Sequence, residues 1–251
     1  MNRKEPLKIL AVGNSFSEDA MTYLGEIFFD YGMKEVVLGY LYIGGASLKL
    51  HHQNMLSESH DYDYWKNEKN QWKHLHDQSF SYGIFDEPWD IIAFQQASGL
   101  SGIESSYEPY LSNLVNHIKE TKDSPTVFMW HSTWAYAHDS TKSAFKDYKF
   151  SQLLMHNQIK KTVKKIIDNH KEFEKIIPVG DAIQNIRLTE IGDNLTRDGF
   201  HLNVLGRYIA ALTWFAKITG LPIQDIEYRP KEITENEVIL AKEAVKLACE
   251  I

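Results

Sequence analysis

The sequence predicts an α/β protein, a three-layer α/β/α sandwich built on a five-stranded parallel sheet. Short apolar runs alternate with longer segments whose apolar residues recur at helical spacing, as in parallel strands joined by helices. The chain has 251 residues, of which 43% are hydrophobic, enough for one large core. Several apolar runs also end at glycine, where a strand gives way to a turn. We therefore expect one domain over residues 1–251.

Five apolar runs predict the strands. The first ends at Gly13, the second at Gly44 and Gly45, and the fifth at Gly180, while the fourth follows Pro125. In chain order the predicted strands are residues 7–12, 36–43, 91–94, 126–130 and 176–179.

Amphipathic segments between and after these runs predict helices at residues 18–31, 109–121, 150–169, 204–219 and 234–250. In the last segment, Val238, Ala241, Val245 and Ala248 recur at helical spacing, so we expect a structural helix with one face in the core. The alternation of strands and helices predicts a doubly wound sheet with right-handed crossovers. Its ligand site should lie outside the carboxyl ends of the strands, at the topological switch point.

The segment at residues 44–90 interrupts this alternation, and a structureless loop of that length is improbable. Its aromatic pattern predicts a local hairpin or a lid, and we favour a structural role for these aromatics over stacking on sugars. It also holds five of the eleven histidines, and His74 and His76 could be half of a metal site. An exposed polar lid explains them more simply, so we expect neither a metal nor a cofactor. The five histidines are His51, His52, His60, His74 and His76.

The charge and cysteine content exclude several classes of function. A net charge of −7 argues against nucleic acid or an anionic membrane as the main partner. With Cys249 as the one cysteine, no intramolecular disulfide can form, and its terminal position makes it a poor nucleophile. No run approaches the roughly 20 apolar residues that span a bilayer. As written the chain is expected to be cytoplasmic, although a periplasmic or secreted protein stripped of its signal peptide would read the same.

The first strand is followed by the run Gly13-Asn14-Ser15-Phe16-Ser17. A serine held at a strand-to-helix turn suits a nucleophile or a contact to an anion. The alternative is that Ser15 or Ser17 only caps the helix. Because position 17 is serine, the run is not the Gly-x-Ser-x-Gly elbow of α/β-hydrolases.

A second motif, Asp198-Gly199-Phe200-His201, lies before a strongly apolar helix. An aspartate and a histidine three residues apart at a turn can pair, which leaves the second imidazole nitrogen free as a base. Alternatively, Asp198 or Asn203 is a capping group and His201 an ordinary loop histidine.

Together the two motifs resemble the first and last blocks of the SGNH, or GDSL-type, hydrolase family. The resemblance spans roughly residues 7–220, and its weight comes from the order and spacing of the blocks. It implies a flavodoxin-like sandwich in which Ser15 is the nucleophile, His201 the base and Asp198 the residue that orients the base. If so, the Ser15 hydroxyl and a ring nitrogen of His201 should lie about 2.6 to 3.2 Å apart.

The family also uses a glycine and an asparagine as donors to the oxyanion hole. Gly45 matches the glycine, although two adjacent glycines could also be only a tight turn. The asparagine is missing, because residues 94–99 read Phe-Gln-Gln-Ala-Ser-Gly. Gln96 or Gln95 could supply an equivalent amide, and strand parity allows only one of them to face the site. We select Gln96 as the donor.

Further residues just beyond the carboxyl ends of the predicted strands are expected to bind substrate. His131, Trp134 and Tyr136 follow the fourth strand, and Asn14 and Gln95 flank the proposed catalytic groups. The predicted substrate-binding set is Asn14, Gln95, His131 and Trp134.

The resemblance, together with the aromatic and polar residues expected around the site, implies a serine esterase that hydrolyses small acyl esters, chiefly acetyl groups on a carbohydrate, with neither nucleic acid nor a membrane as a partner. Within the enzyme class, the rival is a lipase or thioesterase, which needs a larger apolar groove. Outside it, the rivals are a flavodoxin-like protein that binds a phosphate or a cofactor, and an SGNH-like sugar-binding module without activity. The sequence leaves the oligomeric state open.

Overall fold

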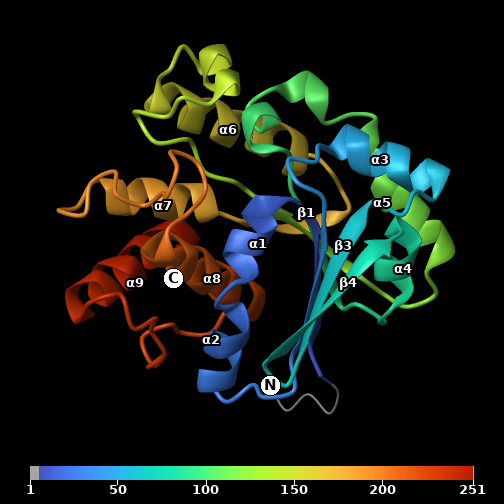
Figure 1. Cartoon of the computed structure of the whole chain (residues 1–251), viewed down its shortest axis with the longest axis horizontal. Coiled ribbons are helices and arrows are strands. Elements are labelled where there is room, and N and C mark those ends of the chain that lie inside the picture. The colour runs from blue at the N-terminus through green and yellow to red at the C-terminus, as the bar shows by residue number, and fades with distance from the viewer. Residues whose placement is uncertain (1–5, 251) are drawn as a thin grey trace.

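The computed structural model describes residues 6–250 of the chain. Within these residues one seven-stranded sheet, in the order β4-β3-β2-β1-β5-β6-β7, lies between two layers of helices (Figure 1). The strands are β1 (Lys8–Gly13), β2 (Val37–Tyr42), β3 (Tyr62–Glu68), β4 (Gln71–Gln78), β5 (Ile91–Phe94), β6 (Val127–His131) and β7 (Phe173–Ile177).

The five predicted strands are present as β1, β2, β5, β6 and β7, and they pair in parallel. The α/β sandwich is therefore confirmed, but the count of five is wrong because two further strands extend the sheet. The parallel strands follow the order 2-1-3-4-5 of flavodoxin-like folds. Strand order thus reverses between β1 and β5, and the switch point lies beyond their carboxyl ends.

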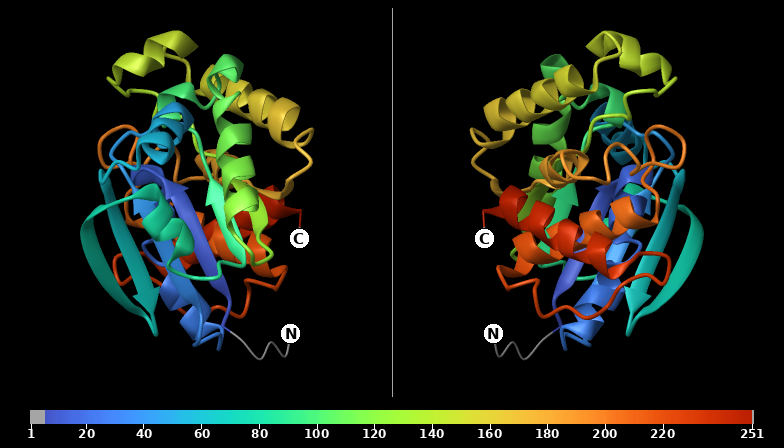
Figure 2. Two further views of the ribbon diagram at one scale, coloured as in Figure 1. Left: turned by 90° about the vertical axis from the view of Figure 1, so that its right-hand side faces the viewer. Right: turned by 90° about the vertical axis from the view of Figure 1, so that its left-hand side faces the viewer.

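The two additional strands form the hairpin predicted within residues 44–90. β3 pairs antiparallel with β2, and β4 pairs with β3. The two-residue turn, Lys69 and Asn70, has φ values of 52° and 59°, which match the twist of a type I′ hairpin. Figure 2 shows this hairpin along one edge of the molecule. The hairpin within the insertion therefore widens the sheet by two strands.

Two helical layers cover the sheet. Figure 1 shows α1, α2, α8 and α9 on one side of it and α3, α4 and α5 on the other. The helices are α1 (Ser15–Met21), α2 (Leu24–Asp30), α3 (Leu48–Ser57), α4 (Phe80–Phe85), α5 (Tyr110–Thr121), α6 (Gln152–Ile167), α7 (Val179–Arg187), α8 (Val204–Thr219) and α9 (Glu235–Cys249), with short 3₁₀ turns at Ser98–Leu100, Glu104–Ser106 and Ser143–Tyr148. None of the helices in the described part of the chain is long and apolar enough to span a membrane.

Four of the five predicted helices are single helices close to their expected bounds, as α5, α6, α8 and α9. The segment at 18–31 is instead split into α1 and α2, with Tyr23 between them. Three helices were not predicted. α3 and α4 lie in the insertion. α7 begins at Val179, so the strand expected at 176–179 ends earlier and lies at 173–177, as β7. A short apolar run does not by itself separate a strand end from a buried helix start.

Helix α8 lies at the centre of its layer. It packs against α1, α2, α7 and α9, and an unbroken run of buried side chains covers residues 208–216. The helix begins where Asn203 accepts a hydrogen bond from the Gly206 N–H at 3.0 Å and ends at Gly220 in the left-handed conformation, as expected for helix caps. This buried helix fixes the loop that immediately precedes it.

Candidate active site

Ser15 lies directly beyond the carboxyl end of the central strand β1. The strand ends at Gly13, and Asn14 caps α1 by accepting a hydrogen bond from the Phe16 N–H at 3.0 Å. Gly13 is required because a Cβ at this position would collide with the side chains of Ser17 and Gln95. The chain therefore turns sharply and holds the first residue of α1, Ser15, at the topological switch point.

The second motif forms a tight loop before α8. One oxygen of Asp198 accepts hydrogen bonds from the N–H groups of Phe200 and His201, at 3.2 and 2.8 Å. Gly199, which lies between Asp198 and Phe200, has a φ of 85°, a conformation that favours glycine. The Arg197 N–H donates to the His201 carbonyl at 2.9 Å and closes the loop. Local hydrogen bonds thus direct the carboxylate and the imidazole toward each other.

The structure brings Ser15, His201 and Asp198 into one hydrogen-bonded chain. His201 Nε2 lies 2.8 Å from Ser15 Oγ, and Nδ1 lies 2.6 Å from the second oxygen of Asp198. The expected separation of serine and histidine is confirmed. Because a carboxylate can only accept, Nδ1 carries the proton and Nε2 is free to accept from the serine hydroxyl.

The environment keeps Asp198 ionised. Partial burial raises the pKa of this carboxyl, but hydrogen bonds from the backbone and ring of His201 and from the Phe200 N–H outweigh burial and leave the pKa below its usual value. An ionised carboxylate stabilises the imidazolium that forms when His201 takes a proton.

A buried carboxylate, Asp19, joins helix α1 to the histidine loop. Its side chain is fully buried and accepts hydrogen bonds from the Leu202 N–H at 2.7 Å, from Arg207 Nε at 2.7 Å and from Arg197 Nη1 at 3.0 Å. Leu202 follows His201 directly, so Asp19 sets the distance between the serine helix and the histidine. Asp19 was not predicted as a site residue, because its partners Arg197, Leu202 and Arg207 lie far away in the sequence.

Trp134 supports the loop at residues 198–201 from the buried side. Its indole N–H donates to the Phe200 carbonyl at 2.8 Å, and its ring stacks on Phe16 with centroids 3.9 Å apart and planes 3° from parallel. A surface hollow opens at Ser15 and His201. The prediction that Trp134 binds substrate is wrong, because its side chain is fully buried and does not line this hollow. A large ring after a strand end can point into the core as well as toward the rim.

The glycine loop after β2 adjoins the serine. The Ala46 N–H donates to the Ile43 carbonyl at 3.1 Å, and Gly45, third in this four-residue turn, has a φ of 66°, which explains the glycine. The Asn14 side chain donates to the Ala46 carbonyl at 3.0 Å. Asn14 therefore connects the serine turn to the glycine turn, and both Asn14 and Gly45 line the hollow.

Neither glutamine lies where we expected it. Gln96 Nε2 donates to the carbonyl and hydroxyl of Ser106, at 2.9 and 3.1 Å, so both amide hydrogens are engaged and the assignment to the oxyanion hole is wrong. Gln95 is also buried and does not line the hollow. Its amide donates to Asn14 Oδ1 at 2.7 Å and its oxygen accepts from Ser17 at 2.8 Å. Both residues follow the end of β5, where strand parity no longer determines direction.

His131 completes the buried network below the serine. Its Nδ1–H donates to the Gln95 side-chain oxygen at 3.1 Å, and burial lowers its pKa to about 3, so the ring is neutral. The residue is buried and outside the hollow, which makes the prediction of substrate contact wrong for His131 and for Gln95. These two side chains instead position Asn14 and Ser17 from beneath.

A hollow of about 660 Å³ opens at the Ser15 and His201 pair. Lys142 lies over the Phe200 ring, 3.7 Å from its centroid. Tyr136 lies at the hollow, as predicted, but most of the lining comes from segments far apart in the chain and was not predicted from the sequence. Besides the residues already placed, the lining includes Glu18, Tyr42, Ser98, Tyr136, Lys142, Asp147, Arg197 and Phe200.

Three side chains that together could hold a metal ion, Asp63, His74 and His76, lie on the β3–β4 hairpin. None of the three lines the hollow. The candidate catalytic chemistry therefore depends on serine, histidine and aspartate.

Comparison with known proteins shows the family and supports the fold. Residues 8–248 match the model described as "Domain of unknown function (DUF4886)". The crystal structure of a DUF4886 family protein from Bacteroides uniformis superposes with a TM-score of 0.93 at 41% identity, covering 97% of this chain and 95% of that one. No curated protein matches the chain.

More distant solved structures share the architecture. A putative SGNH hydrolase from Slackia heliotrinireducens matches with a TM-score of 0.57 at 15% identity, covering 85% of this chain and 100% of that one. A catalytic mutant of an acetylxylan esterase from Geobacillus stearothermophilus matches at 0.53 and 10% identity, covering 91% and 100%. At such identities the likeness shows the fold alone, which is the fold of SGNH hydrolases and esterases.

Proposed function

Given that this chain belongs to the DUF4886 family and has the fold of SGNH hydrolases, we propose that it is a serine esterase acting on small acyl esters. One observation carries the proposal: the hydrogen-bonded chain from Ser15 through His201 to Asp198 at the mouth of a hollow. Neither a phosphate-binding turn nor a sugar-binding module needs this arrangement.

In the proposed mechanism, Ser15 Oγ attacks the ester carbonyl carbon while His201 Nε2 takes the hydroxyl proton. The carbonyl oxygen becomes an oxyanion, stabilised by the backbone N–H groups of Ser15 and Gly45. The ester C–O bond then breaks, and the departing alcohol takes the proton from His201. Water attacks the acyl-serine with His201 again as the base, which releases the acid and restores the serine.

The hollow favours a small acyl group on a polar alcohol. Aromatic side chains, Tyr42, Tyr136 and Phe200, share the lining with charged groups such as Glu18 and Arg197. This mixture suits the hydroxyl-rich faces of a carbohydrate better than a long acyl chain. We therefore propose acetylated carbohydrate as the substrate class, with lipid and thioester substrates as alternatives within the same chemistry.

The test is hydrolysis of 4-nitrophenyl acetate and of longer acyl esters by the wild type and by Ser15→Ala. We expect the variant to lose at least about 1,000-fold in kcat/KM, and the wild type to prefer acetyl over octanoyl. The control is Ser105→Ala, the same change at an exposed position in a 3₁₀ turn. Equal rates for the wild type and Ser15→Ala would end the proposal.

A covalent probe tests the nucleophile independently of the substrate. A fluorophosphonate should add once to the wild type, at Ser15, as read by mass spectrometry, and should not add to Ser15→Ala. If Ser15 were labelled but no ester were hydrolysed, the nucleophile would be correct and the proposed substrate class would be wrong. Absence of labelling would favour the inactive binding module. A panel of acetylated sugars and choline esters would then fix the alcohol.

A further inference from the structure

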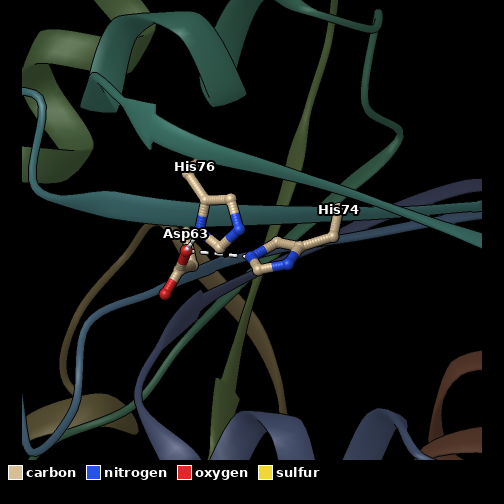
Figure 3. Close-up of side chains that lie close together, drawn as sticks. All are labelled: Asp63, His74 and His76. Atoms are coloured by element: carbon tan, nitrogen blue, oxygen red, sulfur yellow. Dashed lines mark hydrogen bonds and ion pairs between the residues drawn. The ribbon is translucent and has the colours of Figure 1, made fainter.

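Two histidines and an aspartate meet on one face of the β3–β4 hairpin. His74 and His76 are two residues apart in β4, so their side chains emerge on the same side of the strand. His74 pairs with Trp65 of β3, and Asp63 is two residues from Trp65 on the same face. The strand register shifts between Tyr62 and Tyr64, beside Asp63, and both histidines lie within hydrogen-bond distance of Asp63. Figure 3 shows the three side chains directed at a common point.

The potential ligand atoms are already close together. Asp63 Oδ1 lies 2.8 Å from His74 Nε2 and 2.7 Å from His76 Nδ1, and the ligand atoms all lie within 4.8 Å of one another. The His74 ring is stacked on Trp65, with centroids 3.8 Å apart and planes 7° from parallel. The aromatic neighbour therefore fixes the orientation of one ligand before any ion binds.

The donor set determines which ions would fit. We propose that Asp63, His74 and His76 form a binding site for a divalent transition-metal ion of the zinc type. Imidazole nitrogens with one carboxylate oxygen suit Zn²⁺ and its neighbours, whereas Mg²⁺ and Ca²⁺ prefer oxygen ligands alone. The His76 side chain is 70% exposed and that of Asp63 37%, so an ion can enter and water can complete its coordination.

The site would fasten the edge of the sheet next to the hollow. Asp63 pairs with Tyr42 of β2, and Tyr42 lines the hollow that contains Ser15. An ion held by Asp63 of β3 and by two histidines of β4 would join the two outer strands. The side-chain hydrogen bonds to Asp63 would be exchanged for metal–ligand bonds, and each neutral imidazole would keep its proton on the nitrogen that does not bind the ion. This proposal does not depend on the esterase activity.

Calorimetric titration of Zn²⁺ into chelator-treated full-length protein tests the site. We expect one ion per chain and a rise in Tm of the wild type with Zn²⁺. In His76→Asn the affinity should fall by at least the roughly 10- to 100-fold that follows even the loss of a ligand's outer hydrogen bond. Asp63→Asn should behave in the same way.

The matched control is His138→Asn. His138 is also exposed and paired with one aspartate, Asp193, at 2.7 Å, but it lies outside the cluster, so its variant should bind Zn²⁺ like the wild type. Circular dichroism establishes that each variant is folded. The proposal is overturned if the wild type takes up no Zn²⁺ at high micromolar concentration, or if His76→Asn and Asp63→Asn both bind as tightly as the wild type.

Discussion

Replacing Asp19 by asparagine should loosen the connection between the serine helix and the histidine loop. The change keeps the shape but removes the charge that faces two guanidinium groups, and the new NH₂ must face one of the three donors. Removing one partner of a buried ion pair costs about 3–5 kcal/mol. Because Arg197 and Arg207 are 39% and 26% exposed and can regain water, we expect the lower end, about 3 kcal/mol.

A loss of this size should be easy to measure. For a chain of this length it corresponds to a fall in Tm of roughly 6–12 °C, and urea unfolding would give the free energy directly. If the proposed function is correct, kcat at a temperature where the variant is folded should fall by about 10- to 100-fold, because the His201 loop is no longer fixed by the Leu202 N–H.

The matched control for this prediction is Asp123→Asn, the same change at an exposed position. It should leave the free energy of unfolding within about 0.5 kcal/mol of the wild type. If Asp19→Asn were as stable as this control, Asp19 would not hold the loop, and the reasoning from its three hydrogen bonds would be wrong.

Three further predictions concern stability. Burial lowers the pKa of His51 and His131 from 6.5 to about 4 and about 3. Their contribution to the free energy of unfolding is therefore complete above about pH 6.5. It is lost as the pH falls, because the unfolded chain takes up protons that the folded chain does not bind. The slope of unfolding free energy against pH between about 6 and 5 should be shallower in His131→Gln by about 1.4 kcal/mol per pH unit, and an unchanged slope would refute the neutral buried ring. Trp134→Phe removes the N–H donated to Phe200 and leaves a gap where the larger indole was buried, so urea unfolding should show a loss of at least about 1 kcal/mol; no loss would mean that this bond contributes nothing. Gly180→Ala places a Cβ against the backbone carbonyl of Thr133. The free energy of unfolding should fall by about 1–3 kcal/mol in the same assay. A variant as stable as the wild type would show that the backbone at Thr133 moves aside at no cost.

Local patterns determined most of the architecture. The five parallel strands and the helices α5, α6, α8 and α9 could be predicted because alternation, length and glycine boundaries are properties of short segments. The hairpin also followed from its aromatic alternation. Its place as two edge strands of the main sheet did not, because strand pairing depends on which edge is left unpaired once the other strands are assembled.

The sequence by itself determined the candidate catalytic residues, because the motifs at Ser15 and at Asp198 and His201 each form within one local turn. Only the tertiary structure decided the surroundings. Gln96 and His131 became buried supports, and Asp19 became a link across the site, because the direction of a side chain after a strand end depends on what packs against it. For the same reason Asp63 meets His74 and His76 only once β3 and β4 have paired.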